Sequence, residues 1–596
     1  MMSRLNFVVI AGVMYCLGCT TATESTSEQV KSIYTNYLRV FINSVDSLQQ
    51  KISGNDTAVF NACFLAARKS YKAVEPFAEY YNPSTAKAIN GPALPEVEPD
   101  NPDYPSPPTG FQVIEELLFP VYDKANYPLL LKEIAALKAA STRLEMVNEN
   151  LVFTDAHIFD AIRLGCFRIE TLGITGFDTP VSFSALTEIP PTLEAIKNYL
   201  GVYRSKTSEA AFARLSDLLM FAIEYTNEHP GFDQFNRAVF LRAYINPLTR
   251  QLNELQQAAS IPFFKEPRPL AANAPTLFEP GIFNAVFYTG SHTDSGSESL
   301  VTLGKLLFNE QRLSVANTRS CSSCHDESKA FSDGLAKNKT FDGKRTILRN
   351  TPTILYAGLQ PALFADSRVA FLEDQAKQVV ENPDEMHGNL VNAAIELSKD
   401  AGYKNAFHNA LGDTIITPAG IQKALAVYIR SKSSFSSRFD EYMRGDLSKL
   451  DSNETAGFNL FMGKAKCGTC HFMPLFNGNV PPLFNKIESE VLGVPRENNK
   501  PYVIDADSGK YRMIRSAPYL YAFKTVTVRN SALTAPYMHN GVFRSLEEVI
   551  EFYNDGGGAG RGIKLDNQTL PADRLNLTAK EKQQLVAFIR TLNDEQ

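Results

Sequence analysis

The stretch that decides the fold is Cys321-Ser322-Ser323-Cys324-His325, and the same spacing returns at Cys467-Gly468-Thr469-Cys470-His471. Two cysteines at this spacing can form thioethers with the vinyl groups of a haem, and the adjacent histidine then lies under the iron. The alternatives are a thioredoxin-like redox pair and a zinc site, which would usually take four ligands in two paired clusters. Here each cysteine pair carries its own histidine, so the repeat predicts two covalently bound c-type haems.

Helical periodicity dominates the first part of the chain. Apolar residues recur at helical spacing through residues 28–260, and strand-like alternation is scarce. A segment rich in proline and then in polar residues follows, and from Leu300 onward short helices alternate with many loops. We therefore predict a mainly α fold: an α-helical bundle domain at residues 20–260, a linker at 261–297, a first haem domain at 298–445 and a second haem domain at 446–596.

The first residues are typical of an export signal. An apolar run from Leu5 to Leu17 is too short to remain as a membrane span. Gly18-Cys19 then resembles a lipoprotein processing site, although Cys16 stands where that pattern has leucine. We expect residues 1–19 to be a lipoprotein signal peptide, which would leave the protein in the periplasm or cell envelope with a lipid anchor as its only membrane attachment. An ordinary secretory signal is the alternative.

The composition is that of a soluble globular protein. Of the 596 residues, 44% are hydrophobic and 21% are charged, and the net charge of -6 gives no reason to expect a nucleic-acid partner. Tryptophan is absent. Cys63 and Cys166 lie outside the haem motifs and the leader, and they either pair in an oxidising compartment or remain buried free thiols.

Further motifs surround the two haem motifs. In chain order they are Leu303-Gly304-Lys305-Leu306-Leu307-Phe308, Phe331-Ser332-Asp333-Gly334, Arg349-Asn350-Thr351-Pro352-Thr353, Asp366-Ser367-Arg368, Asn382-Pro383-Asp384-Glu385-Met386 and Thr534-Ala535-Pro536-Tyr537-Met538-His539-Asn540-Gly541. This order resembles the bacterial diheme cytochrome c peroxidase family, which includes the methylamine-utilisation enzyme MauG. The resemblance covers about residues 298–596.

The resemblance implies roles at the first haem, which binds peroxide in this family. Glu385 matches the family's distal acid, which can move a proton between the two peroxide oxygens. Gln375 would donate a hydrogen bond in the same pocket, and Arg368 would contact the haem. Without the motif, Glu385 would be taken as a surface acid. Members of the family often cap this haem with a histidine, but none occurs between His325 and His387, so we expect an open first haem with His387 on the pocket rim.

The second haem relays electrons in this family, and its distal ligand is usually a methionine. Tyr553 stands at that position here, as a tyrosine does in MauG, so the resemblance implies phenolate ligation and a lowered potential. Met538 is the competing ligand. An aromatic side chain that only packs on a helix face is the plainer interpretation of Tyr553.

The resemblance also implies a calcium site and a bridging indole between the haems. Asn350, Thr534 and Pro536 match the calcium ligands, one side-chain oxygen and two carbonyls, which suit this hard cation. On their own these residues would be interpreted as turn formers. The family's bridging tryptophan is replaced by Ala365, so another residue must fill that space.

The helical domain carries Gly110-Phe111-Gln112-Val113-Ile114-Glu115. This resembles the G-x-H-x-x-E motif of imelysin-like proteins, which are helical, exported and linked to iron uptake. Gln112 replaces the histidine, so one metal ligand is missing. We expect a docking or interaction domain rather than a retained metal site.

Together these patterns predict an enzyme that reduces hydrogen peroxide with electrons from a small periplasmic donor, a cytochrome c or a cupredoxin. One alternative is a MauG-like oxidase of a protein side chain, which Tyr553 and the uncapped first haem favour and Ala365 opposes. The other is a non-enzymatic electron carrier fused to an iron-binding module.

Overall fold

The structure is a computed structural model, and it describes residues 24–52, 57–98, 100–290 and 296–595. The predicted signal peptide, with Cys16 and Cys19, lies outside these residues. Within them, no helix combines the length and the apolar character needed to cross a bilayer.

The structure is mainly α-helical, as the sequence predicts. The first half contains α1 (Thr26–Lys51), α2 (Thr57–Tyr81), α3 (Pro83–Asn90), α4 (Phe111–Leu118), α5 (Tyr127–Asn150), α6 (Asp155–Thr171), α7 (Ile189–Gly201), α8 (Glu209–Glu228), α9 (Arg237–Phe240) and α10 (Asn246–Ala258). The second half contains α11 (Glu298–Phe308), α12 (Leu372–Glu381), α13 (Leu390–Leu397), α14 (Ala401–Leu411), α15 (Pro418–Arg430), α16 (Arg438–Arg444), α17 (Ser452–Phe461), α18 (Leu546–Asn554), α19 (Gly557–Gly560) and α20 (Ala579–Arg590).

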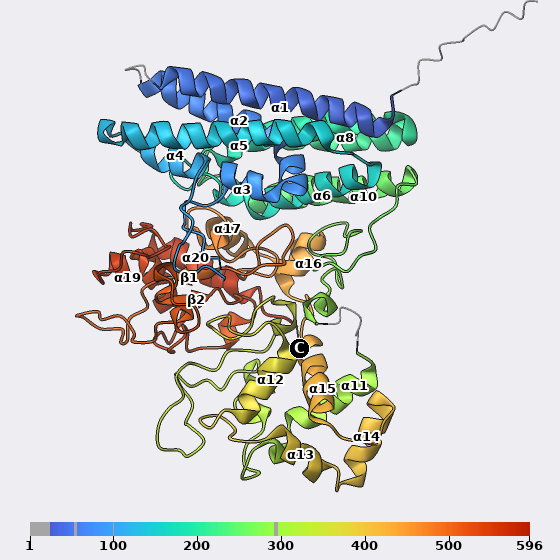
Figure 1. The fold of residues 1–596 in the computed structure, drawn as a ribbon, viewed down its shortest axis with the longest axis vertical. Helices are drawn as coiled ribbons and strands as arrows, with labels where there is room; N and C mark the ends of the chain where they lie inside the picture. The colour runs from blue at the N-terminus through green and yellow to red at the C-terminus, as the bar shows by residue number, and fades with distance from the viewer. Residues whose placement is uncertain (1–23, 53–56, 99, 291–295, 596) are drawn as a thin grey trace, which may run out of the picture.

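Local sequence explains the long helices of the bundle. Ser25 and Glu28 form a capping box that starts α1, and a buried stripe at helical spacing runs from Val30 to Leu48. Gly165 lets α6 approach α2 closely, because a Cβ atom there would lie 3.1 Å from the Cβ of Pro76. The helices α1, α2 and α5 lie side by side in layers at one end of the molecule (Figure 1).

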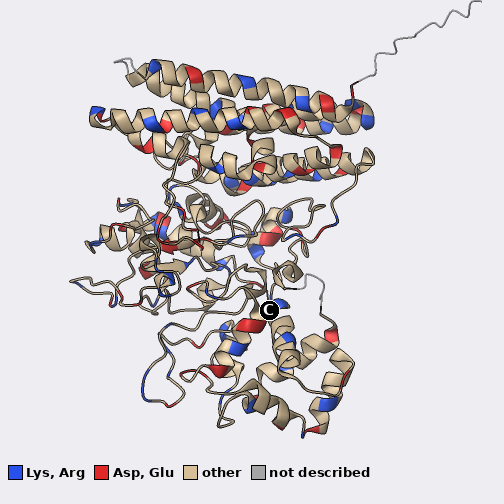
Figure 2. Cartoon of the chain, viewed as in Figure 1, with Lys and Arg blue, Asp and Glu red and all other residues tan. Residues whose placement is uncertain are grey.

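The remaining chain forms two regions below the bundle. The helices α11 to α15 form the far end, and the region with α16, α17, α20 and the strands lies between it and the bundle (Figure 1). Strand β1 (Ser489–Val491) pairs antiparallel with β2 (Ala522–Lys524), with Glu490 opposite Phe523. Basic and acidic side chains are interspersed along the helices rather than separated by sign (Figure 2).

One hydrophobic core joins the helical bundle to the second haem domain. Buried residues from Val30 through Tyr288 form a single cluster with Tyr356, Leu359 and others from Phe435 through Leu592. Most buried residues between Leu300 and Tyr428, in the predicted first haem domain, form a second cluster. Residues 261–290 contribute to the larger cluster through Leu270, Phe278 and other buried side chains. The bundle and the second haem domain therefore pack as one body.

Candidate active site

The first Cys-x-x-Cys-His motif forms a tight turn that presents its histidine. The short helix η8 (Cys321–Ser323) is followed by His325, whose backbone N–H donates to the carbonyl of Cys321 at 2.9 Å. The Nδ1 atom of His325 lies 3.0 Å from the carbonyl oxygen of Phe331, to which it donates as the Nδ1–H tautomer. Burial lowers the pKa of His325. The ring is therefore neutral with Nε2 free, which is the form that binds a metal.

The second motif repeats this geometry. It forms η12 (Cys467–Thr469), and the backbone N–H of His471 donates to Cys467 at 2.9 Å. The Nδ1 atom of His471 lies 3.0 Å from the carbonyl oxygen of Val526, and burial lowers the pKa of His471 to about 4. Both cysteines of each motif are free thiols. Two thiols and an imidazole with a free Nε2 at each turn fit the attachment of a c-type haem.

Glu385 lies beside the first motif. Arg319, just before Cys321, donates from Nη1 to the backbone carbonyl of Glu385 at 3.0 Å. The carboxyl group is close enough to Cys324 to interact with it electrostatically. Burial raises the pKa of Glu385, while a 2.8 Å hydrogen bond from Asn382 and the charge of Arg368 act in the opposite direction. This carboxyl is thus shifted toward its protonated form.

The other residues predicted for the first pocket lie around α12. Gln375 is on this helix and partly buried. Arg368 reaches the same helix, donating from Nε to Gln378 at 3.1 Å, and its guanidinium lies 3.4 Å from the ring centroid of Phe364. Arg368 also influences the pKa of Glu385. His387 is exposed.

Tyr553 is placed next to the second motif. It lies on α18, and burial raises the pKa of its phenol, with smaller contributions from Cys470 and Cys467. Glu490 on β1 contributes to the same shift and hydrogen-bonds with Cys470. Met538 packs against the same small apolar cluster as Tyr553. The helix therefore brings the phenol of Tyr553 close to Cys467 and Cys470, while its ring also packs against Phe552.

The predicted calcium ligands lie in two adjoining segments. The backbone N–H of Asn350 donates to the carbonyl of His539 at 2.7 Å, which joins the first segment to the loop that contains Thr534 and Pro536. The side-chain amide of Asn350 donates to the carbonyl of Leu335 at 2.7 Å. The amide oxygen of Asn350 is thereby turned away from Leu335.

The surroundings of Ala365 show which aromatic residues lie near the position of the missing indole. The carbonyl of Ala365 accepts a hydrogen bond from Lys524 at 2.8 Å, at the end of β2. The preceding residue, Phe523, stacks on His539 with ring centroids 3.8 Å apart and an interplanar angle of 9°. The sequence alone does not reveal this pair, because its two members come from separate segments.

Two neighbours of the predicted site were not expected from the sequence. Arg319 lies two residues before Cys321, and a cation so close to the motif was the available signal. Glu490 carries no such signal, because it lies on β1, well beyond the second motif in the chain, and only the fold brings it to Cys470.

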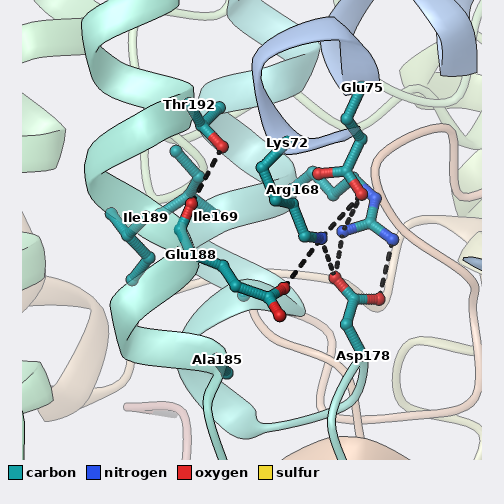
Figure 3. Close-up of a pocket in the computed structure, with 10 residues that line it drawn as sticks. Lys72, Glu75, Arg168, Ile169, Asp178, Ala185, Glu188, Ile189 and Thr192 are labelled. Atoms are coloured by element: carbon teal, nitrogen blue, oxygen red, sulfur yellow. Dashed lines mark hydrogen bonds and ion pairs between the residues drawn. The ribbon is translucent and has the colours of Figure 1, made fainter. Parts of the chain in front are cut away.

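The imelysin-like motif of the helical domain is engaged in internal contacts. Gln112 donates to the carbonyl of Asn90 at 3.2 Å, and the carboxylate of Glu115 accepts from the backbone N–H of Ser182 at 2.7 Å. Close by, Lys72 and Arg168 are paired with acidic side chains, among them Asp178 and Glu75, in a buried cluster (Figure 3). Cys63 and Cys166 are free thiols.

Comparison with known proteins identifies the family. Residues 298–448 match the family model described as di-haem cytochrome c peroxidase. The cytochrome-c peroxidase IdrP1 of Pseudomonas sp. (strain SCT) is 33% identical over 316 residues, which cover 50% of this chain and 81% of that protein. This chain belongs to the di-haem cytochrome c peroxidase family. The expectation from the motifs is confirmed, and the imelysin-like resemblance stays a prediction.

The family includes relatives of both functional types. The methylamine utilization protein MauG of Methylorubrum extorquens is 33% identical over 296 residues, covering 50% of this chain and 78% of that protein. A solved MauG-like protein associated with microbial copper homeostasis is 30% identical, with a TM-score of 0.46, and covers 50% of this chain and 91% of that one. This chain is thus similar to peroxidases and to MauG alike.

Proposed function

We propose that this protein is a periplasmic diheme peroxidase that reduces hydrogen peroxide to water with electrons from a small donor protein, a cytochrome c or a cupredoxin. The observation that carries the proposal is the placement of Glu385 beside Cys324 by Arg319, with a raised pKa. A partly buried carboxyl with a raised pKa takes up a proton more readily than an ordinary carboxylate, and cleavage of an O–O bond requires such a proton carrier. The reaction consumes one peroxide, two electrons and two protons and gives two waters.

The residues that would hold the haems follow from the two motifs. Cys321 and Cys324 would bind the first haem covalently, with His325 as its iron ligand. Cys467 and Cys470 would bind the second, with His471 and Tyr553 as its ligands. When bound, haem supplies the iron at which peroxide is reduced and a store of electrons for that reduction.

Protein side chains would handle the protons at the first site. The Oε2 atom of Glu385 would accept the proton from one peroxide oxygen and return it to the other, which leaves as water. Asn382 donates to Oε1 at 2.8 Å and so holds the carboxyl in place. Gln375 would donate a hydrogen bond to the peroxide, and Arg368 would contact the haem.

An oxidase of a protein side chain is the second candidate function. It is supported by Tyr553, which lies beside Cys470, and by the similarity to MauG. Long-range oxidation needs a path for electrons, and the tryptophan of that path is absent here. The Phe523–His539 stack beside Ala365 would have to take its place.

The other parts of the proposal concern calcium, the anchor and the helical domain. We propose that Asn350, Thr534 and Pro536 bind one Ca²⁺, since amide and carbonyl oxygens suit it. The leader sequence supports export and a lipid anchor at Cys19. The helical domain is proposed as an interaction domain.

A direct experiment tests the enzymatic proposal. The fully ferric protein is mixed with one equivalent of peroxide, and its absorption spectrum is followed before and after a reduced donor is added. We expect the ferric spectrum to change on mixing and to return as the donor is oxidised, with two donor electrons consumed per peroxide. A ferric protein that is inert to peroxide would contradict an open first haem.

A further inference from the structure

The helical domain covers the loop that would attach the second haem. Its segment Gly173–Glu188 contains η2 (Gly173–Thr175) and η3 (Ala185–Glu188). A Cβ atom at Gly468, inside the second haem motif, would lie only 3.2 Å from Cγ2 of Thr175. Phe177 contacts Phe472 edge to face, with ring centroids 5.8 Å apart. The covering segment therefore touches the motif and the residue that follows it.

Buried ion pairs hold this covering segment in place. Asp178 lies in the segment and accepts hydrogen bonds from Arg168 at 2.7 Å and from Lys72 at 2.5 Å (Figure 3). Arg68 donates to the backbone carbonyl of Asp178 at 2.8 Å, and Glu115 accepts from the N–H of Ser182. Breaking a buried pair leaves a charge without a partner, so the segment is fixed. The buried cluster therefore holds the segment Gly173–Glu188 in place against the helical domain.

Arg237 brings a positive charge to the same interface. It is fully buried, and its guanidinium donates to the backbone carbonyls of Ile174, Phe232 and Phe235 at 2.8, 2.9 and 3.2 Å. A Cβ atom at Gly463, shortly before Cys467, would lie 2.6 Å from its Nη1 atom. The guanidinium of Arg237 is thus packed between the segment Gly173–Glu188 and the residues that precede the second haem motif.

The charge of Arg237 is not neutralised locally. Among the residues that the structure describes, no carboxylate lies within ion-pair distance of its guanidinium, and Asp233 acts on it only at longer range. Burial lowers the pKa of Arg237 to about 10, so it remains charged at neutral pH. The partial charges of three carbonyl groups solvate it without cancelling it.

We propose that the helical domain tunes the second haem, with Arg237 as a fixed positive charge that raises the reduction potential of the haem bound by Cys467, Cys470 and His471. Reduction adds one electron to the haem, and a nearby cation in a poorly solvated interior stabilises the added negative charge. This effect opposes the lowering expected from Tyr553. The inference rests on the proposed function in one respect, that the second haem stores electrons. Arg237 is a positioning and tuning residue, because it contacts no substrate.

The test measures the reduction potential of each haem by spectroelectrochemical titration of the whole protein. In Arg237→Gln, the equilibrium constant for reducing the second haem should fall by about tenfold, because one positive charge is removed from the interface. Arg237→Lys keeps the charge and should retain most of the wild-type potential. The first haem should be unaffected in both. Equal shifts in the Gln and Lys variants, or no shift in Gln, would overturn the proposal.

A second pair of variants tests the same charge without altering Arg237. Thr175 lies beside Ile174, which accepts from Arg237, and beside Gly468. Thr175→Asp would place a compensating carboxylate there and should lower the potential of the second haem, whereas Thr175→Asn should not. If both variants behave alike, a charge at this interface does not reach the second haem, which would overturn the proposal.

Titration of the potentials separates this inference from the proposed function, because it needs no turnover. A protein that is inert to peroxide but shows the shift specific to Arg237→Gln would overturn the peroxidase and support the tuning role. A protein that turns over peroxide, but whose potentials are unchanged in Arg237→Gln, would support the peroxidase and overturn the tuning role of Arg237.

Discussion

Arg529 forms a fully buried, bidentate ion pair with Asp440, with its two guanidinium nitrogens 2.8 and 2.6 Å from the carboxylate oxygens. Asp440 lies on α16, at the end of the predicted first haem domain, and Arg529 lies just before the loop of the predicted calcium ligands. The pair therefore ties the connection between the two haem domains into the larger core. Asp440 and Arg529 are far apart in the sequence, so no local sequence pattern predicts this ion pair.

Loss of this pair should destabilise the protein strongly. Asp440→Asn leaves the buried cation of Arg529 without its partner, and the free energy of unfolding should fall by about 3–5 kcal/mol. Asp384→Asn is the matched control, since Asp384 pairs with Arg345 at the surface and such a pair contributes about 0–1 kcal/mol. Denaturant titration of both variants measures the difference, and equal losses would contradict a structural role for the buried pair.

The same pair predicts a dependence on pH. Burial alone would raise the pKa of Asp440, but the charge and hydrogen bonds of Arg529 outweigh it and hold this pKa below its usual value. The stabilisation is therefore present above the unfolded-state pKa of about 3.9 and is lost as the pH falls through the folded-state value. Wild-type stability should drop more steeply below about pH 4 than that of Asp440→Asn. Parallel acid-unfolding curves would rule this out.

The two haem motifs should each bind one haem covalently. A pyridine haemochrome assay on denatured protein should give about two haems per chain. Replacing Cys467 and Cys470 with serine should reduce the count to one, because no thioether can form there. Cys63→Ser is the control, since Cys63 is a free thiol of the helical domain. A count of one in wild type would remove the second site.

Glu385→Gln should keep both haems and slow the reaction with peroxide by about 10²–10⁴-fold. The amide has nearly the same shape as the acid but cannot carry the proton. Glu381→Gln is the control, because Glu381 is an exposed acid in the same segment. Stopped-flow mixing with peroxide measures both rates. A wild-type rate in Glu385→Gln would exclude this carboxyl from the proton transfer.

The sequence predicts the parts of this molecule that depend on local spacing. Helical periodicity predicts the bundle, and α1 begins at the capping box of Ser25 and Glu28. The two haem motifs form equivalent turns, because each closes through a hydrogen bond between residues of the motif itself. Family motifs place Glu385 and Tyr553 next to Cys324 and Cys470, respectively.

The parts that depend on packing between distant segments could not be predicted. Arg237 and Gly463 are far apart in the chain, and only the shared core brings them into contact. The stack of Phe523 on His539 likewise needs the strand β2 and a separate loop. The imelysin-like motif predicts a docking or interaction domain, but it gave no sign that its Glu115 accepts a hydrogen bond from the segment that covers the second haem motif.

Removal of calcium should loosen the contact between the haem domains. A Ca²⁺ held by Asn350, Thr534 and Pro536 would stabilise the folded protein by about 2.7 kcal/mol at a free concentration one hundred times its dissociation constant. A chelator should therefore lower the melting temperature of wild type, and added Ca²⁺ should restore it. Asn350→Ala should melt at the lower temperature with or without the chelator. Restoration of wild type by Mg²⁺ as readily as by Ca²⁺ would contradict a site selective for calcium.

Replacement of Tyr553 should change the second haem alone. A phenolate is a hard anionic ligand that favours ferric iron, so wild-type protein should keep this haem oxidised at potentials where a methionine-ligated haem is already reduced. Tyr553→Met should raise the potential of the second haem, and the first haem should not respond. Tyr537→Phe serves as control, since Tyr537 donates to the carbonyl of Ser531 in the neighbouring loop.

The same variants decide whether the protein needs reductive activation. If Tyr553 ligates the second haem, and since no histidine lies between His325 and His387, fully ferric wild-type protein should react with peroxide directly. Tyr553→Met should react faster after partial reduction, because its second haem then holds an electron at accessible potentials. If ferric wild type is inert, half-reduced wild type reacts, and Tyr553→Met leaves the potentials unchanged, then Met538 is the ligand and the protein is a peroxidase activated by reduction.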